Sequence, residues 1–174
     1  MSRSRTSTAS AADSVTYSPS IEIEYSMPSK IDNISLVVEN VILMLTQLAC
    51  VPGGEEAVEI ALREALNNAV VHGNHSDPQK RVSVKCRCIS GEIFIAVKDE
   101  GQGFDFSKIP NPTTPITVYS AHGRGIYLMK AFMDDVWFEE DGSLVQMRKR
   151  AMPGDHRIPQ TRQSSLHDRR GARS

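Results

Sequence analysis

The chain has 174 residues, 40% of them hydrophobic, which suits one globular domain with tails. Its formal net charge of -1 argues against direct nucleic-acid binding and against a membrane-surface binder. It has no apolar run near 18 residues and no apolar stretch behind Arg3 and Arg5, so we expect neither a membrane span nor secretion. The three cysteines, Cys50, Cys86 and Cys88, are odd in number and lie in apolar patterns, which predicts reduced thiols in the cytoplasm rather than a disulfide framework.

Composition divides the chain into a core and two tails. Residues 1–17 are rich in Ser, Thr and Ala, which predicts a disordered tail. Residues 151–174 are basic, with Ile158 and Leu166 as their aliphatic anchors, which predicts a solvated tail or, alternatively, an electrostatic contact with an acidic partner. Residues 18–150 remain for one folded domain.

The core begins with a strand pattern and a helix pattern. Apolar and charged residues alternate over 21–25, which indicates a half-buried strand. Pro28-Ser29 predicts the start of a helix, with Ser29 and Asp32 spaced as an acidic variant of the capping box. An apolar stripe carries this helix to Leu48.

A second helix follows a clear break. Pro52-Gly53-Gly54 interrupts the first helix, and Glu55 begins the next with negative charge at its positive N-terminal end. We expect this helix to continue to about His72, where Gly73 supplies the usual stop.

The remaining patterns complete an α+β protein. Period-two alternation, an aperiodic loop with three prolines, a short apolar helix and a hairpin across Asp141-Gly142 follow in turn. These elements are expected at residues 81–88 (strand), 93–97 (strand), 104–122 (loop), 126–133 (helix), 136–139 and 144–149 (hairpin strands). The order predicts a two-layer α/β sandwich with helices covering one face of a mainly antiparallel mixed sheet.

Glu64 and Asn68 are four residues apart in the second predicted helix, so their side chains project from one face. Such a pair is usually solvated, but Ala57, Ile60 and Ala61 precede it on the same side. A carboxylate there can accept a proton from an attacking hydroxyl or water. An amide oxygen there suits Mg²⁺, which prefers oxygen ligands.

Asp99 follows a strand pattern and falls, by period-two counting, on the same core face as Ile95 and Val97. A carboxylate there is costly unless a group donates a hydrogen bond to it, and one candidate donor is the exocyclic amine of adenine. Alternatively, Asp99 caps the turn made by Gly101 and Gly103. Both glycines suit either interpretation, because both require a sharply bent or closely approached backbone.

Gly123-Arg124-Gly125 precedes an apolar helix pattern. Free amides at a helix N-terminus, with no side chains at the two glycines, can bind an anion, although the motif is also common where a loop simply enters a helix. The proline-containing loop of about residues 104–122 predicts a lid that orders over bound phosphate.

These motifs, in this order, resemble the boxes of the GHKL ATPase superfamily. Residues 63–74 (REALNNAVVHGN) resemble its N box, residues 99–105 (DEGQGFD) its first glycine box, and residues 122–126 (HGRGI) its second. Residues 142–145 (GSLV) resemble the closing strand motif. The resemblance covers about residues 20–150 and implies the Bergerat ATP-binding fold. Within the superfamily, the short stand-alone form is similar to the anti-sigma-factor serine/threonine kinases.

The resemblance implies roles for the matching residues. Glu64 corresponds to the general base, Asn68 to the Mg²⁺ ligand, and Asp99 to the acid that recognises adenine. Gly101 and Gly103 correspond to the glycines near the nucleotide.

Four further residues match the phosphate and closing-strand motifs. Gly123 and Gly125 correspond to the glycines at the phosphates, and Ser143 stands where family members often have Thr. Family members often place an arginine just before the second glycine box, whereas this chain has one inside it, so Arg124 is the substitute.

The resemblance implies an ATP- and Mg²⁺-dependent protein serine/threonine kinase of the cytoplasm. Its implied partners are a sigma factor that it binds and a STAS-type anti-sigma-factor antagonist that it phosphorylates, with a possible homodimer. The alternative function is a non-catalytic, nucleotide-dependent binding switch of the same fold.

Overall fold

The computed structural model describes residues 20–103 and 121–152. The expected tail at 1–17 lies outside these residues. So do residues 153–174 of the expected tail at 151–174 and residues 104–120 of the expected lid at 104–122. The side chains of residues 121–123 also lie outside the description.

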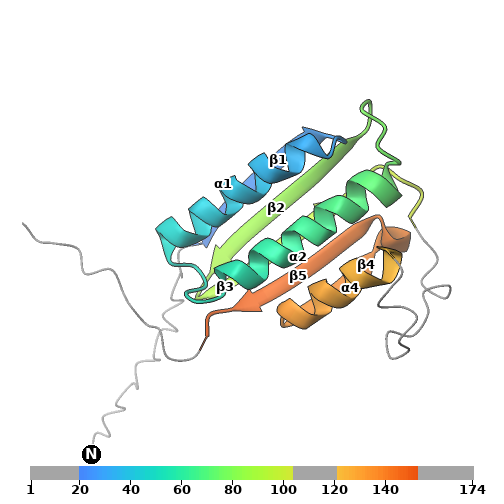
Figure 1. The fold of residues 1–174 in the computed structure, drawn as a ribbon. Helices are drawn as coiled ribbons and strands as arrows, with labels where there is room; N and C mark the ends of the chain where they lie inside the picture. Colours follow the sequence, from blue (N-terminus) through green and yellow to red (C-terminus); the bar gives the residue numbers. More distant parts are fainter. Residues whose placement is uncertain (1–19, 104–120, 153–174) are drawn as a thin grey trace, which may run out of the picture.

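One antiparallel sheet forms the first layer of the fold (Figure 1). Its five strands stand in the order β1-β2-β3-β5-β4, and all four pairings are antiparallel. β1 pairs with β2 across α1 and α2, and β3 pairs with β5 across α4 and β4. The strands are β1 (Ser20–Pro28), β2 (Arg81–Ile89), β3 (Glu92–Lys98), β4 (Asp135–Glu139) and β5 (Leu144–Arg150).

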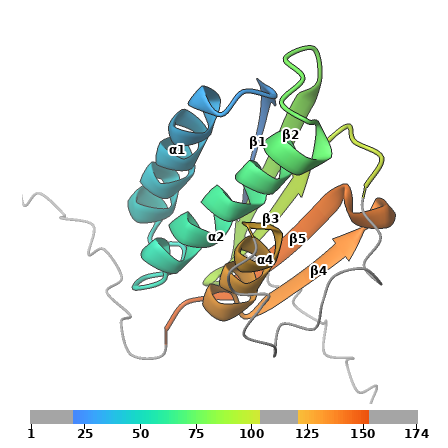
Figure 2. The same cartoon turned by 45° about the vertical axis from the view of Figure 1, so that its right-hand side comes forward.

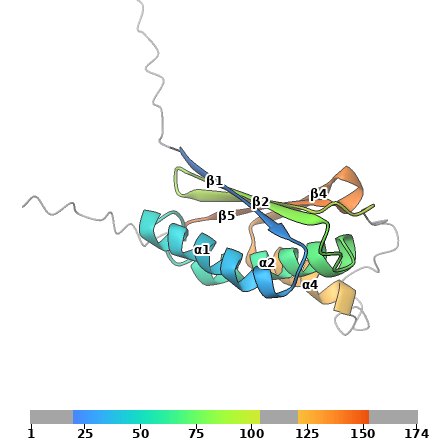
Figure 3. The same ribbon diagram turned by 90° about the horizontal axis from the view of Figure 1, so that it is seen from above.

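Three helices of the described residues, α1, α2 and α4, form the second layer, and all of them lie on one face of the sheet (Figure 3). α2 (Glu55–Asn67) lies between α1 (Asp32–Leu48) and α4 (Ala121–Phe132) and packs against both (Figure 2). The predicted two-layer α+β sandwich is therefore confirmed. None of the helices in the described ranges is long and apolar enough to cross a membrane.

The core lies between the two layers. The period-two patterns predicted its sheet side, because Val84, Cys86, Ile93 and Ile95 are all at most 1% exposed. Helix residues at three- and four-residue spacing fill the other side. The buried helix residues include Val38, Val41, Leu45, Val58, Leu62, Leu66 and Met129.

The start of α1 differs from the predicted capping box. Pro28 still pairs with Arg81 at the end of β1, so the chain remains extended, and α1 begins at Asp32 without a side-chain cap. The backbone N–H of Ser29 donates to the carbonyl of Lys80 at 2.9 Å, and its hydroxyl is buried without a hydrogen-bond partner. Strand pairing thus displaced the helix start, a tertiary effect that local spacing does not reveal.

The last hairpin has the predicted strand bounds at its turn. β4 ends at Glu139 and β5 begins at Leu144, and the four residues between them include the 3₁₀ turn η3 (Glu140–Gly142). Glu140 has φ 49°, Asp141 φ 54° and Gly142 φ 93°, so three successive residues take left-handed conformations. The predicted strands on either side of the turn are present.

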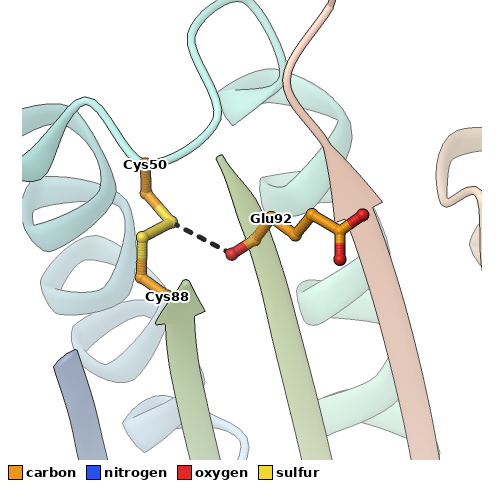
Figure 4. Close-up of a disulfide and its surroundings, with 3 residues drawn as sticks. All are labelled: Cys50, Cys88 and Glu92. Atoms are coloured by element: carbon orange, nitrogen blue, oxygen red, sulfur yellow. Dashed lines mark hydrogen bonds between the residues drawn. A yellow bond between two sulfur atoms is a disulfide. The ribbon is translucent and has the colours of Figure 1, made fainter. Parts of the chain in front are cut away.

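The prediction of three reduced thiols was wrong in one respect. Cys50 and Cys88 form a disulfide with a Cα–Cα distance of 6.0 Å (Figure 4), whereas Cys86 is a free, buried cysteine. The two partners are separated by 38 positions and belong to different layers. Sequence periodicity could not place them together, because Cys50 lies in the turn after α1 and no local pattern specifies where that turn meets β2.

Candidate functional site

The helix that carries the N-box motif changes its winding before it ends. α2 stops at Asn67, and the chain continues as one π-helical stretch, η1 (Asn68–Gly73). The N–H of Asn74 accordingly donates to the carbonyl of Ala69, five residues back, at 2.8 Å. The helix expected to reach about His72 is therefore present, but its last turn is π-helical, a feature often found at functional sites. The wider turn brings the end of the helix toward the sheet.

Gly73 ends the helical segment, as predicted, and also permits a close contact. It is the last residue of η1, and a Cβ at this position would come within 3.0 Å of the carboxyl group of Asp99. A Cβ at Gly101 would likewise meet the Gly73 carbonyl carbon at 2.7 Å. The two glycines let the helix end and the turn after β3 approach closely, which no larger residue permits.

Asp99 occupies the inward position that strand period predicted, with 8% exposure. Its Oδ1 accepts a hydrogen bond from the N–H of Gly101 at 2.8 Å, so the turn-capping interpretation is also correct. Burial raises the pKa of Asp99, while the bond from Gly101 and the charges of Lys80 and His75 oppose that shift. The carboxylate is thus held in a fixed orientation, and a further hydrogen-bond donor would stabilise its buried charge.

Asn74 connects the elements around Asp99, and sequence analysis did not identify it. Its side chain is fully buried; Nδ2 donates to the Arg81 carbonyl at 2.9 Å, and Oδ1 accepts from the N–H of Glu100 at 2.9 Å. One amide therefore joins the end of η1, the start of β2 and the turn after β3. An asparagine directly after a glycine at a helix end was the available signal, but it commonly marks a simple helix terminus.

Glu64 and Asn68 converge on the first turns of α4. A Cβ at Gly125 would lie 3.0 Å from Glu64 Oε2 and 3.2 Å from Asn68 Oδ1. The structure thus brings the N box and the second glycine box together. Both oxygens lie directly against Gly125, so a carboxylate and an amide are neighbours there, and both side chains are partly exposed.

The second glycine box lies within α4 rather than just before it. α4 begins at Ala121, so Gly123 lies in the first helical turn, where backbone N–H groups have no partner inside the helix. Gly125 is the fifth residue, where its N–H is in the range of the helical ladder. The missing Cβ, rather than a free amide, is what Gly125 contributes. Arg124 is exposed.

Ser143 and Gly103 connect the last hairpin to this region. The Ser143 carbonyl accepts a hydrogen bond from the N–H of Asp99 at 2.9 Å, and its hydroxyl donates to the Glu140 carbonyl at 2.9 Å. Gly103 has φ 73°, and a Cβ there would meet Asp141. The sequence-predicted residues Asp99, Gly101, Gly103 and Ser143 therefore lie together around the end of β3.

The donor set can hold Mg²⁺ through one amide oxygen. No group of three or more His, Cys, Asp or Glu side chains in the described ranges could bind a metal ion. At nucleotides, Mg²⁺ is usually held by one or two protein oxygens together with phosphates and water. Asn68 Oδ1, beside Gly125, has the required ligand type.

Comparison with known proteins identifies the class. Residues 27–149 match the model of the histidine kinase-like ATPase domain, and the chain therefore belongs to that family. Its matched span includes every candidate site residue described above.

Curated relatives narrow the family to the anti-sigma-factor kinases. The chain is 33% identical to an anti-sigma F factor of Heyndrickxia coagulans over 52% of its length and 66% of that protein. It is 35% identical to the serine-protein kinase RsbW of Bacillus subtilis over 54% of its length and 63% of that protein. An anti-sigma F factor of Oceanobacillus iheyensis is 33% identical over 60% of the chain and 75% of that protein. The resemblance to anti-sigma-factor serine kinases is thereby confirmed.

Proposed function

We propose that this protein is an ATP-dependent serine/threonine protein kinase that acts as an anti-sigma factor. The observation that carries the proposal is the convergence of Glu64 and Asn68 on Gly125, at the end of the molecule where Asp99 also lies. Two of the relatives reported above are named for anti-sigma activity and one for serine-protein kinase activity. The chain spans about two thirds of these proteins.

Phosphoryl transfer depends chiefly on positioning and charge, and the site supplies both. Glu64 is the general base, because its carboxylate lies beside Gly125 and is partly exposed to a partner's hydroxyl. It accepts the proton of a Ser or Thr hydroxyl as that oxygen attacks the terminal phosphate and ADP leaves. A side chain at position 125 would push against the Glu64 carboxylate.

Asn68 and the second glycine box bind the phosphate end of ATP. The amide oxygen of Asn68 is the protein ligand for Mg²⁺, which when bound offsets the negative charge of the phosphates. Backbone N–H groups in the first turn of α4, including that of Gly123, have no partner inside the helix and can bind phosphate oxygens at its positive end. Exposed Arg124 adds a cation beside them.

Asp99 binds the adenine end. Oδ1 is held by Gly101, so the carboxylate is oriented before the nucleotide arrives, and its burial favours a ligand that donates a hydrogen bond. The exocyclic amine of adenine is such a donor. Gly73, Gly101 and Gly103 keep side chains away from the carboxylate and the adjoining turn.

The proposed partners are proteins. A sigma factor is bound and a STAS-type anti-sigma-factor antagonist is phosphorylated, in the cytoplasm, and the kinase forms a homodimer. The names of the relatives support the sigma-factor part of this proposal.

The decisive experiment measures phosphate transfer. The full chain is incubated with Mg²⁺ and ATP labelled at the terminal phosphate, together with candidate STAS-domain proteins from the same genome. We expect label on one Ser or Thr of one candidate, and its loss when that residue is changed to Ala. A chain that binds no ATP in calorimetry would contradict the whole proposal.

The same experiment separates the kinase from a nucleotide-dependent binding switch. A switch would bind ATP and a sigma factor but label no antagonist. The presence of Glu64 beside Gly125 favours the kinase, because a protein that only binds nucleotide does not require a general base at this position.

A further inference from the structure

The connector between α1 and α2 and the end of β2, which carry the disulfide, lie at the end of the fold opposite the C-terminal end of α2 (Figure 1). Cys50 belongs to the connector between α1 and α2, and Cys88 lies near the end of β2 (Figure 4). Glu64 and Asn68 lie at the far end of α2 from this connector. The bond therefore joins the helical layer to the sheet without contacting the nucleotide site.

Backbone hydrogen bonds hold both cysteines in place independently of the bond. The N–H of Cys50 donates to the Leu45 carbonyl at 3.0 Å, and that of Gly54 donates to the Val51 carbonyl at 2.8 Å. Cys88 is paired on both sides, with β1 and with β3. Breaking the sulfur–sulfur bond thus leaves the two sulfurs as neighbours, ready to react again.

The surroundings also accommodate the reduced state. Cys50 Sγ lies 3.6 Å from the backbone carbonyl oxygen of Glu92, although a disulfide sulfur has no proton to donate (Figure 4). After reduction, the Cys50 thiol has this acceptor in place, which matters because Cys50 is only 2% exposed. Cys88 is partly exposed, so a reagent can reach it.

Cys86 provides an internal contrast. It lies two residues from Cys88 on the same strand, is fully buried, and burial raises its pKa to about 12. Its thiol is therefore neither accessible nor ionised near neutral pH. Of the three cysteines, Cys50 and Cys88 have the placement for reversible chemistry.

We propose that Cys50 and Cys88 form a reversible thiol-oxidation site that reacts with low-molecular-weight disulfides of the glutathione type. The Cys88 thiolate attacks one sulfur of the reagent, forms a mixed disulfide and releases one thiol. The Cys50 thiolate then attacks the Cys88 sulfur and releases the second thiol. The two cysteines lose two electrons and two protons, and the reagent gains them as two thiols.

Oxidation at this site fixes the connector before α2 to the sheet. Because the bond closes a long loop, it lowers the entropy of the unfolded chain, and we expect the oxidised protein to melt about 10 °C higher than the reduced protein. The nucleotide site should respond little, because the backbone hydrogen bonds of the connector are present in both states. Oxidation thus raises the stability of the folded domain and leaves its ligand affinity unchanged.

The test uses the full chain in buffers of stepped reduced-to-oxidised glutathione ratio. Samples are quenched with acid, alkylated and digested, and mass spectrometry reads the linked and the alkylated peptides. We expect one two-electron transition between a Cys50–Cys88 link and two alkylated thiols. Cys86 should remain unlabelled when alkylation is done on the folded protein. Thermal melting and ADP calorimetry on both forms complete the measurement.

Two variants control the chemistry. Cys50→Ser should leave the mixed disulfide trapped on Cys88, whereas Cys86→Ala should retain the complete transition. A link that resists dithiothreitol in the folded protein would overturn the proposal, since the bond would then be a fixed structural cross-link. Alkylation of both cysteines at every ratio, or equal melting of the two forms, would overturn it as well.

Discussion

The two ends of α2 are built on different principles. At its N-terminal end, the connector packs with buried Val51, and the Cys50–Cys88 bond joins the two layers. Beyond its C-terminal end, in η1, the backbone of Gly73 packs against the carboxyl group of Asp99. The buried side-chain amide of Asn74 joins the end of η1, β2 and the turn after β3 by hydrogen bonds. The first end gains stability from packing and a covalent bond, whereas the second holds polar groups in fixed positions.

The difference shows which end of α2 carries features that reduce stability and that we assign to function. A buried carboxylate with a raised pKa and a helix that widens before it ends are unfavourable for stability alone. Both occur at the C-terminal end of α2. Changes at that end should therefore alter ligand binding or catalysis, and changes at the other end should alter stability without affecting the ligand.

The largest expected effect is on chemistry. Glu64→Gln keeps the shape of the side chain but removes the base, so phosphate transfer should slow by roughly 10²–10⁴-fold while ATP still binds. Labelled-phosphate transfer and calorimetry measure the two properties separately. Glu59→Gln, one turn earlier and paired with Arg63, is the matched control and should leave the rate unchanged. Transfer at the normal rate in Glu64→Gln would show that another group is the base.

Asn74→Ala tests the two buried hydrogen bonds by which the Asn74 side chain holds the turn that follows Asp99. It leaves the Arg81 carbonyl and the Glu100 N–H without their partners, so we expect a stability loss of about 2–4 kcal/mol in urea unfolding. ADP affinity should fall as well, because the Asp99 turn loses its anchor. The control variant Asn33→Ala removes a single, exposed side-chain hydrogen bond. It should cost less than about 1 kcal/mol of stability. Equal losses in the two variants would contradict the special role of Asn74.

A pair of glycine substitutions sharpens the comparison of the two ends. Gly73→Ala forces a Cβ onto the Asp99 carboxyl group, so ADP affinity should fall about tenfold or more. Gly91→Ala, at the disulfide end, adds a Cβ with ordinary contact to Ala151 at 3.9 Å, but its φ of +76° is strained. It should cost about 1–2 kcal/mol of stability and leave ADP affinity unchanged. Unchanged affinity in a folded Gly73→Ala protein would argue against the assignment of Asp99.

Asp99→Asn separates stability from binding. The asparagine can still accept the bond from Gly101, but it carries no charge, so ADP affinity should fall about tenfold or more. Its melting temperature near neutral pH should be equal to or above that of the wild type, because an ionised carboxylate is no longer buried. Calorimetry and thermal melting test both statements. A large drop in melting temperature with normal affinity would make Asp99 a structural residue.

The pH dependence of the wild type follows from the same group. Burial raises the pKa of Asp99 above its ordinary value of 3.8, so below that value the carboxyl is protonated in both the folded and the unfolded state. As pH rises through the raised pKa, the folded state resists ionisation and loses stability, while the carboxylate becomes able to accept from adenine. ADP affinity should therefore weaken on acidification with a midpoint above 3.8, and Asp99→Asn should remove that component.

The sequence by itself determined the layers and most of the site. Period-two patterns identified the buried faces of β2 and β3, and with them the inward position of Asp99. Spacing placed Glu64 and Asn68 on one helix face. These features are legible because side-chain period reports directly which face of an element is buried.

Only the tertiary structure decided how segments distant in sequence meet. The pairing of Cys50 with Cys88, the displaced start of α1 and the joint at Asn74 each depend on a partner that no local pattern specifies. Gly73 illustrates the physical reason. Its local sequence indicates a helix stop, but the requirement for glycine comes from the Asp99 carboxyl group that packs against its backbone.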